Sequence, residues 1–177
     1  MCHWKHQWRS DASLTKCKQL NHNTMLTDRS QHYGGVLYRI VNHSESQVRL
    51  RQISDKAGHY SINDGSRFLI RSRTCESSPW QFTITPSDLA TLVDDCRETG
   101  LFGDSHLCLI CGNTAICSLS LEEWSQLLDL HRKRSQAIIV RSQNGCQLNV
   151  SGSAGSLSYK IPRSRFPSNL IGVAQAA

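Results

Sequence analysis

The sequence lacks any long hydrophobic run. Its apolar stretches, such as residues 137–140, are far shorter than the roughly 20 residues that a membrane-spanning helix requires. The first 24 residues are basic and polar and contain no apolar core of a secretory signal. We therefore expect an intracellular protein with no membrane contact, in which residues 1–30 form a disordered arm. An organelle-targeting segment is the alternative interpretation of the same residues.

The sequence also lacks the patterns of common catalytic and metal centres. No Ser-His-Asp or Cys-His arrangement stands out, and the glycine-rich stretch 152–156 lacks the Lys-Ser/Thr ending of a phosphate-binding loop. The eight cysteines are scattered, which favours reduced thiols. Cys108 and Cys111 form a single C-x-x-C motif on an expected strand, where the two thiols would point to opposite faces. We predict no enzyme activity, no cofactor and no metal site; a zinc-stabilised module is the third interpretation.

What the chain does contain is a series of β-forming runs separated by turn residues, which is typical of β-hairpins. The strongest signal is Asn144-Gly145, because this dipeptide suits a tight turn between strands. The expected hairpins are 36–41 with 47–53, 67–73 with 80–85, 106–111 with 114–119, and 137–142 with 146–151, followed by a strand at 156–162.

Two helices are expected, and both begin with a capping box. Thr85 can cap the first helix with Asp88 three residues later, and Ser120 can cap the second with Glu123. Apolar residues then recur at helical spacing, so that one face of each helix is apolar. We expect these residues to share one core beneath the sheet: Leu89, Leu92, Val93, Trp124, Leu127 and Leu128.

The resulting order is ββββα-ββα-βββ, which predicts an α+β fold: an antiparallel sheet of hairpins with two amphipathic helices packed on one face. A single domain over 31–170 would contain two related hairpin-helix units, 36–99 and 106–165. Thr85 and Ser120 are 35 residues apart, and similar residues recur at that offset, which indicates a weak internal repeat. The alternative is that any strand entering a capped amphipathic helix looks this way.

Acidic residues are missing altogether from one segment. Residues 131–165 carry seven basic residues and no acidic one, whereas 86–130 carry eight acidic residues and one basic. Residues 36–73 are also basic, with a net charge of +4. If helices cover one face of the sheet, the other face should therefore be positive.

Strand alternation places arginines of the basic segment 36–73 on common faces, because residues two apart share a face. In the first expected hairpin, three arginines would lie together, with aromatic side chains nearby for base stacking. The candidate nucleic-acid-binding residues are Arg39, Arg49, Arg51, Arg67, Arg71, Arg73 and Tyr60. The alternative is a solvated sheet face that uses arginine for solubility.

The stretch 118–130, SLSLEEWSQLLDL, resembles the C-terminal part of the single-stranded-DNA-binding transcriptional positive-coactivator family. The matching residues are Ser118, Leu119, Glu123, Trp124, Ser125, Gln126 and Leu127. The resemblance implies a four-stranded antiparallel sheet followed by a helix, as in the related plant Whirly proteins, whose sheet binds a single strand. Residues 36–99 look like one such ββββα unit. The lysine-rich hairpin of the coactivators has no clear counterpart here.

These observations predict a non-catalytic protein that binds single-stranded nucleic acid through a basic sheet face, with a transcription-related role as the resemblance implies. The alternative is a protein-interaction or assembly factor on the same scaffold, with an acidic protein surface as partner. Self-association of the chain is a further option.

Overall fold

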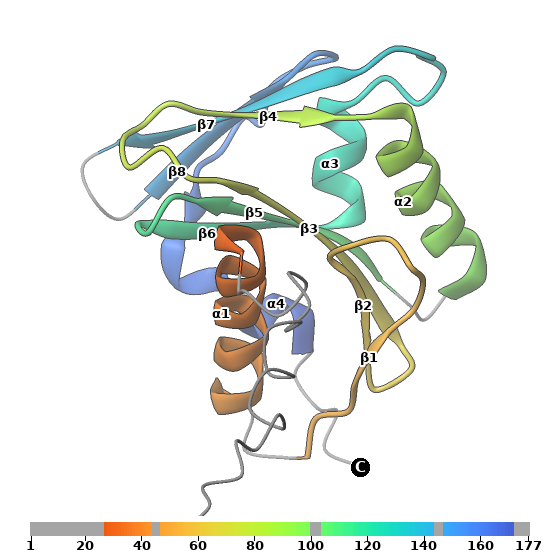
Figure 1. Ribbon diagram of the computed structural model, residues 1–177. Helices are drawn as coiled ribbons and strands as arrows, with labels where there is room; N and C mark the ends of the chain where they lie inside the picture. Colours follow the sequence, from red (N-terminus) through yellow and green to blue (C-terminus); the bar gives the residue numbers. More distant parts are fainter. Residues whose placement is uncertain (1–26, 44–46, 100–103, 144–146, 172–177) are drawn as a thin grey trace, which may run out of the picture.

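The computed structural model describes residues 27–43, 47–99, 104–143 and 147–171, which form helices on two β-sheets (Figure 1). No helix among these residues is long and apolar enough to cross a membrane. The elements in chain order are α1 (Asp28–His43), β1 (Leu50–Gln52), β2 (His59–Ile62), β3 (Ser66–Arg73), β4 (Trp80–Ile84), α2 (Pro86–Thr99), β5 (Ser105–Cys111), β6 (Ala115–Leu119), α3 (Leu121–Leu127), β7 (Gln136–Gln143), β8 (Gln147–Gly152), β9 (Ile161–Pro162), the 3-10 turn η2 (Arg163–Arg165) and α4 (Ser168–Ile171).

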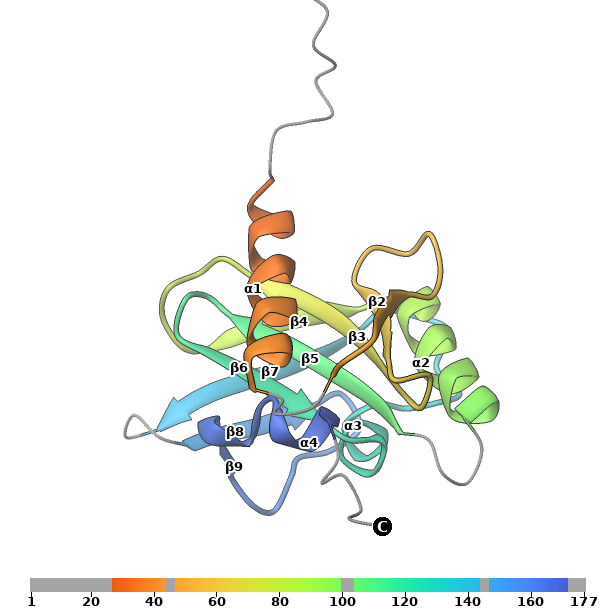
Figure 2. The same cartoon turned by 90° about the horizontal axis from the view of Figure 1, so that it is seen from below.

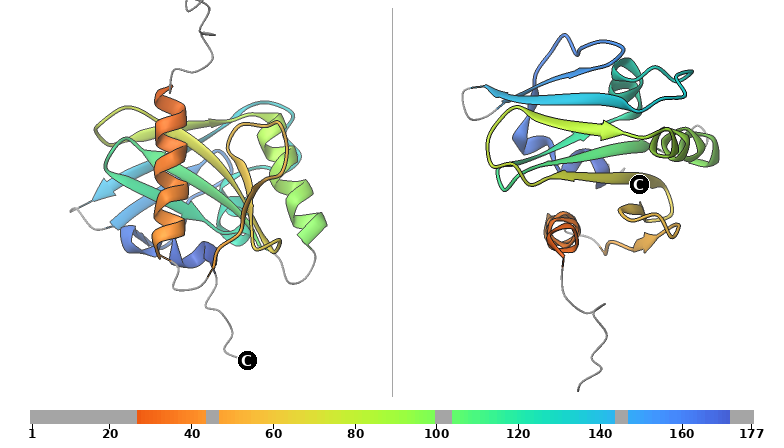
Figure 3. Two further views of the ribbon diagram at one scale, coloured as in Figure 1. Left: turned by 60° about the horizontal axis from the view of Figure 1, so that its bottom comes forward. Right: turned by 45° about the horizontal axis from the view of Figure 1, so that its top comes forward.

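The strands form a five-stranded sheet, in the order β1-β2-β3-β5-β6, and a four-stranded sheet, in the order β4-β7-β8-β9. All pairs are antiparallel except β3 and β5, which run parallel from Arg67 beside Ser105 to Arg73 beside Cys111. Between these two strands the chain passes through β4 and α2. The two sheets lie face to face, as the right-hand view of Figure 3 shows.

The five-stranded sheet is buried on both faces. One face packs against the four-stranded sheet and α3, and the other is crossed by α1, with α4 beside it (Figures 1 and 2). Every residue of β5 is buried, which accounts for its nearly continuous apolar sequence. The four-stranded sheet buries Trp80, Phe82 and Ile84 of β4 toward the core, while Gln81 and Thr83 alternate to the outside.

Both predicted capping boxes are present. The backbone N–H of Asp88 donates to the Thr85 hydroxyl and the N–H of Thr85 donates to the Asp88 carboxylate, each at 3.1 Å. At α3, the N–H of Ser120 donates to the Glu123 carboxylate at 2.9 Å. Each box satisfies backbone donors that a helix start would otherwise leave unpaired.

The predicted α+β class is confirmed. From β1 onward the number of strands before, between and after α2 and α3 matches ββββα-ββα-βββ, but the first four strands are not the four that were predicted. The hairpins β5–β6 and β7–β8 are also confirmed. The strand predicted at 36–41 is wrong, because this stretch lies in α1. Val36 and Ile40, four residues apart, are fully buried on one side of that helix with Tyr33. Burial at helical spacing therefore overrides the β-propensity of VLYRIV.

Further expectations about the sheets and the N-terminal segment are corrected. Strand β2 was not predicted, and 67–73 and 80–85 do not form a hairpin, because β3 and β4 lie in different sheets. The sheet is thus not single, and the four strands before α2 are not one ββββα sheet. Helix α1 covers a face that the prediction left open. Of the expected N-terminal arm, 1–26 lie outside the described residues, whereas Asp28 already begins α1.

The predicted helical core is confirmed. Leu89, Leu92, Trp124, Leu127 and Leu128 lie in one buried cluster between the sheets, and Val93 packs against it. The Trp124 indole is 1% exposed and donates its Nε1–H to the carbonyl of Ser105 at 3.1 Å.

We expect Trp124→Ala to lower the free energy of unfolding by about 3–5 kcal/mol, because it leaves a cavity at the junction of both sheets. Urea unfolding followed by circular dichroism measures this change. The exposed Tyr38 serves as a control, and Tyr38→Ala should cost far less. A cost below about 1 kcal/mol for Trp124→Ala would contradict the central position of α3.

Candidate nucleic-acid interface

Two of the three β3 arginines, Arg67 and Arg71, were expected to face solvent but are paired with buried carboxylates of α2. Asp88 is 4% exposed and forms a bidentate ion pair with Arg71. Lys56 approaches the same carboxylate at 2.9 Å. Burial opposes ionisation of Asp88, but the hydrogen bonds from Arg71 and Lys56 outweigh it and hold the pKa of this carboxyl well below its usual range.

A second carboxylate of α2 holds two further basic side chains. Asp95 is 1% exposed, and its oxygens lie 2.9 and 3.0 Å from Nε2 of His59. Because a carboxylate only accepts hydrogen bonds, this Nε2 carries the donating proton. Arg67 reaches Asp95 at 3.3 Å and also pairs with Glu98 on the helix surface.

The remaining predicted residues do not assemble on one surface. Arg49 and Arg51 both pair with the exposed Asp64, at 3.2 and 3.5 Å. Arg73 donates from Nε to the carbonyl of Gln81, at the edge of β4. Arg39 lies on α1 over the ring of Phe166, and Tyr60 stacks on Phe68 with ring centroids 5.7 Å apart.

Strand alternation was correct for β3, since Arg67, Arg71 and Arg73 share one face. That face is not open, however, because α2 and β4 lie over it. Arg67 and Arg71 keep only 19% of their side-chain area exposed. The predicted basic face built from Arg39, Arg49, Arg51, Arg67, Arg71 and Arg73 is therefore corrected: their structural roles differ and they lie on separate elements.

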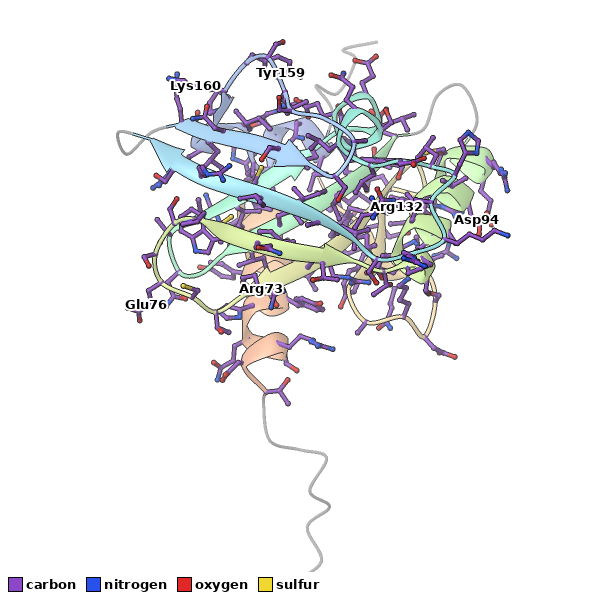
Figure 4. The ribbon with its side chains drawn as sticks, turned by 90° about the horizontal axis from the view of Figure 1, so that it is seen from above. Arg73, Glu76, Asp94, Arg132, Tyr159 and Lys160 are labelled. Carbon is purple, nitrogen blue, oxygen red and sulfur yellow. The ribbon has the colours of Figure 1, made fainter. Side chains whose placement is uncertain are left out.

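The open sheet face belongs instead to the four-stranded sheet. Figure 4 views this face directly, with the strands in front of the helices. Its outward residues lie in rows across the strands, because Gln81 pairs with Ile139 and Ile139 with Ser151, while Arg141 pairs with Asn149. Arg141 is exposed and donates to the Ser151 hydroxyl at 3.3 Å. The face is mainly polar, and its half-buried apolar residues are Ala137 and Ile139 on β7.

Exposed cations border this open face. Figure 4 shows Arg73 beside the edge of β4, Lys160 on the opposite side, and Arg132 at the end near α2. Lys133 and Arg134 follow Arg132 in the exposed segment that leads into β7. Among the described residues, no carboxylate pairs with Arg73, Arg132, Lys133, Arg134, Arg141 or Lys160.

Sequence reasoning gave its weight to a different basic segment. The signal was present, since residues 131–165 contain no acid, but the strands at 36–73 received the weight because of their alternating arginines. One cation of the later segment is structural: Arg165 pairs with the buried Glu123, to which Tyr159 also donates at 2.7 Å. Although burial opposes it, these bonds lower the pKa of Glu123.

The cysteines of the C-x-x-C motif are packed in the core. Cys108 belongs to the cluster beneath α1 and Cys111 to the cluster between the sheets, so the two thiols point to opposite faces as predicted. Burial raises the pKa of each thiol to about 12. Within the described part of the chain, no group of three His, Cys, Asp or Glu side chains could hold a metal ion.

Comparisons of the chain with protein-family models, with curated proteins and with solved structures returned no match. A functional assignment therefore rests on the geometry and charge of this molecule.

We expect Arg71→Ala to destabilise the fold by on the order of 3 kcal/mol, because it removes a partner of the buried Asp88 carboxylate. Chemical denaturation of both variants at neutral pH measures the difference from Arg97→Ala, the control. Arg97 lies on α2, the helix that carries Asp88, but its side chain is 76% exposed. Its removal should therefore cost less than about 0.5 kcal/mol. Equal costs would contradict a structural role for Arg71.

His106 is a buried titratable group, and neither ring nitrogen has a hydrogen-bond partner among the described residues, although the Asp104 carboxylate lies 3.9 Å from Nε2. Burial lowers its pKa from 6.5 to about 4, and the charge of Arg165 acts in the same direction, against the opposing charges of Asp104 and Glu123. The ring is therefore neutral at pH 7 in the folded protein.

This depressed pKa predicts a loss of stability in mild acid. The unfolded chain takes up a proton on His106 below about pH 6.5, whereas the folded chain does so only near pH 4, so stability is full above 6.5 and falls between these values. The contribution is about 3 kcal/mol. Unfolding free energies of the unmodified protein and of His106→Leu, measured from pH 7.5 to 4, test it. The variant should show a flatter profile, and an unchanged slope would contradict this role.

Proposed function

We propose that the protein is a non-catalytic, single-stranded nucleic-acid-binding protein whose binding surface is the open face of the four-stranded sheet. The observation that carries this proposal is the border of exposed cations with no described carboxylate partner. Such cations attract a phosphate backbone, because binding releases the counterions that surround it.

The chemistry of the face favours a single strand. Amide and hydroxyl side chains such as Gln81 and Ser151 can bond to the exposed edges of unpaired bases. Ile139 offers an apolar contact, and Tyr159 at the rim is 51% exposed and available for stacking. The resemblance of 118–130 to the coactivators supports the same class of function, including a transcription-related role inside the cell.

A second candidate function is protein interaction through α1. Two large apolar side chains of this helix are exposed to solvent: Tyr38 is 70% exposed and Val41 is 53% exposed. They lie three residues apart and therefore on neighbouring parts of one helix face. This surface suits a protein partner or self-association better than a nucleic acid.

The nucleic-acid proposal predicts salt-dependent binding that depends on the open face. Replacing Arg132, Arg134 and Arg141 together by Ala should weaken binding of a labelled single-stranded oligonucleotide. The slope of log K against log salt should flatten by about 2, at roughly 0.7 per lost phosphate contact. Fluorescence anisotropy at several salt concentrations measures both quantities.

The matched control is the triple variant of Arg39, Arg49 and Arg51, all exposed on α1 or beside β1, across the five-stranded sheet from the open face. It loses the same net charge and should leave the slope nearly unchanged. Equal weakening by both variants would indicate a general charge effect instead of a site. No binding by the unmodified protein at low salt would reject the nucleic-acid function and leave α1 as the candidate surface.

A further inference from the structure

Two adjoining cavities lie along the first half of α1. One, of about 360 Å³, is lined by α1, β3 and the start of α2. The other, of about 320 Å³, lies between α1 and the strands β1 and β2. Figures 2 and 3 show the helix and these two strands on the same face of the five-stranded sheet. Arg29, Tyr33 and Ala57 line both, so the cavities are contiguous. Each falls within the size range of small-molecule sites.

The first cavity carries an excess of positive charge. Arg29, Lys56 and Arg71 line it against a single carboxylate, that of Asp88. Lys56 and Arg71 both bond to this carboxylate, so their pairing still leaves one positive charge, and the exposed Arg29 adds a second. The Lys56 ammonium also donates to Ser87 and Thr91, so Lys56 contributes charge, while Arg29 and Arg71 supply the donors for a ligand. The hydroxyls of Ser72 and Thr83 also line the cavity. An anion with several oxygen acceptors, such as a phosphate, matches this lining.

The second cavity is mainly apolar and aromatic. Tyr33 and Tyr60 line it, with Leu37 beside them. Both rings are held in place: the Tyr33 hydroxyl donates to the carbonyl of Ile70 at 3.2 Å, and Tyr60 stacks on Phe68. Fixed aromatic walls favour a flat ring as ligand, because stacking then costs no rearrangement of the protein.

One of two neighbouring glycines in α1, Gly34, leaves room for the second cavity. Gly34 and Gly35 lie inside the helix, where each costs about 1 kcal/mol relative to alanine. Neither has a positive φ, and a Cβ at either position would meet no atom within 4 Å. Neither backbone geometry nor packing among the described residues therefore requires a glycine. Gly34 lines the tyrosine cavity, whereas Gly35 faces a separate groove beside the β5–β6 turn.

We propose that the two cavities form one site for a small ligand that joins a phosphate group to a flat ring, the chemistry of a nucleoside monophosphate. The phosphate lies near Arg29, Lys56 and Arg71, and the ring lies between α1 and Tyr60. This site is separate from the open face of the four-stranded sheet and is independent of nucleic-acid binding there.

Isothermal titration calorimetry of the full chain tests the site with adenosine 5′-monophosphate, adenosine and inorganic phosphate. The monophosphate should bind more tightly than either part alone. Gly34→Leu should fill the ring cavity and weaken monophosphate binding at least about tenfold, with little effect on inorganic phosphate. Arg29→Gln should weaken both phosphate-bearing ligands about fivefold.

Matched controls are available on the same elements. Gly35→Leu makes the same change on the other side of α1, and Arg97→Gln removes an exposed charge elsewhere; both should bind the monophosphate as the unmodified protein does. Equal weakening by Gly34→Leu and Gly35→Leu, equally tight binding of adenosine, or no binding of the monophosphate would overturn the site. The triple variant of Arg132, Arg134 and Arg141 should retain monophosphate binding, so failure of the nucleic-acid proposal is distinguishable.

Discussion

The arrangement of this molecule depends on carboxylates that are buried at helix starts and must find cations there. Asp88 and Glu123 occupy the same position of two capping boxes and are 4% and 2% exposed. A charge so deeply buried is tolerated only when it is paired and hydrogen-bonded. Asp88 takes its cations from β3 and from the chain before β2, and Glu123 takes Arg165 from the C-terminal segment. These pairs therefore tie each helix to chain segments far away in sequence.

The same pairing decides which surface stays positive. Because α2 engages Arg67 and Arg71 of β3, the five-stranded sheet has no free basic face, and its other face is buried beneath α1. The four-stranded sheet has one face in the core and no helix on the other. The segment that supplies three of its strands contains no acid. Five exposed cations of this segment therefore remain without a described carboxylate partner and can attract an external anion: Arg132, Lys133, Arg134, Arg141 and Lys160.

Local signals predicted the parts of the fold whose cause is local. The capping boxes at Thr85 and Ser120, the amphipathic faces of α2 and α3, and the pairing of β7 with β8 follow from short sequence patterns. The turn predicted at Asn144-Gly145 itself lies outside the described residues. The strand prediction at 36–41 was wrong because VLYRIV fits both periods, and only tertiary burial of Val36 and Ile40 selects the helix. The division into two sheets was also beyond local reasoning, since β3 pairs in parallel with a strand that follows α2.

The candidate site shows the limit of charge counting along a sequence. Arg71 and Arg141 are the same residue type on strands, and alternation places both on definite faces. Their roles differ because Arg71 is paired with a buried aspartate, while Arg141 lies on an exposed sheet face and has no carboxylate partner among the described residues. A strand pattern specifies the face of an arginine, but the partner opposite that face depends on which distant element covers it. Net positive charge in a segment therefore indicates a binding surface only after the cations required by buried carboxylates have been subtracted. For this chain, that subtraction removes Lys56, Arg67, Arg71 and Arg165, whereas the cations at the rim of the four-stranded sheet remain.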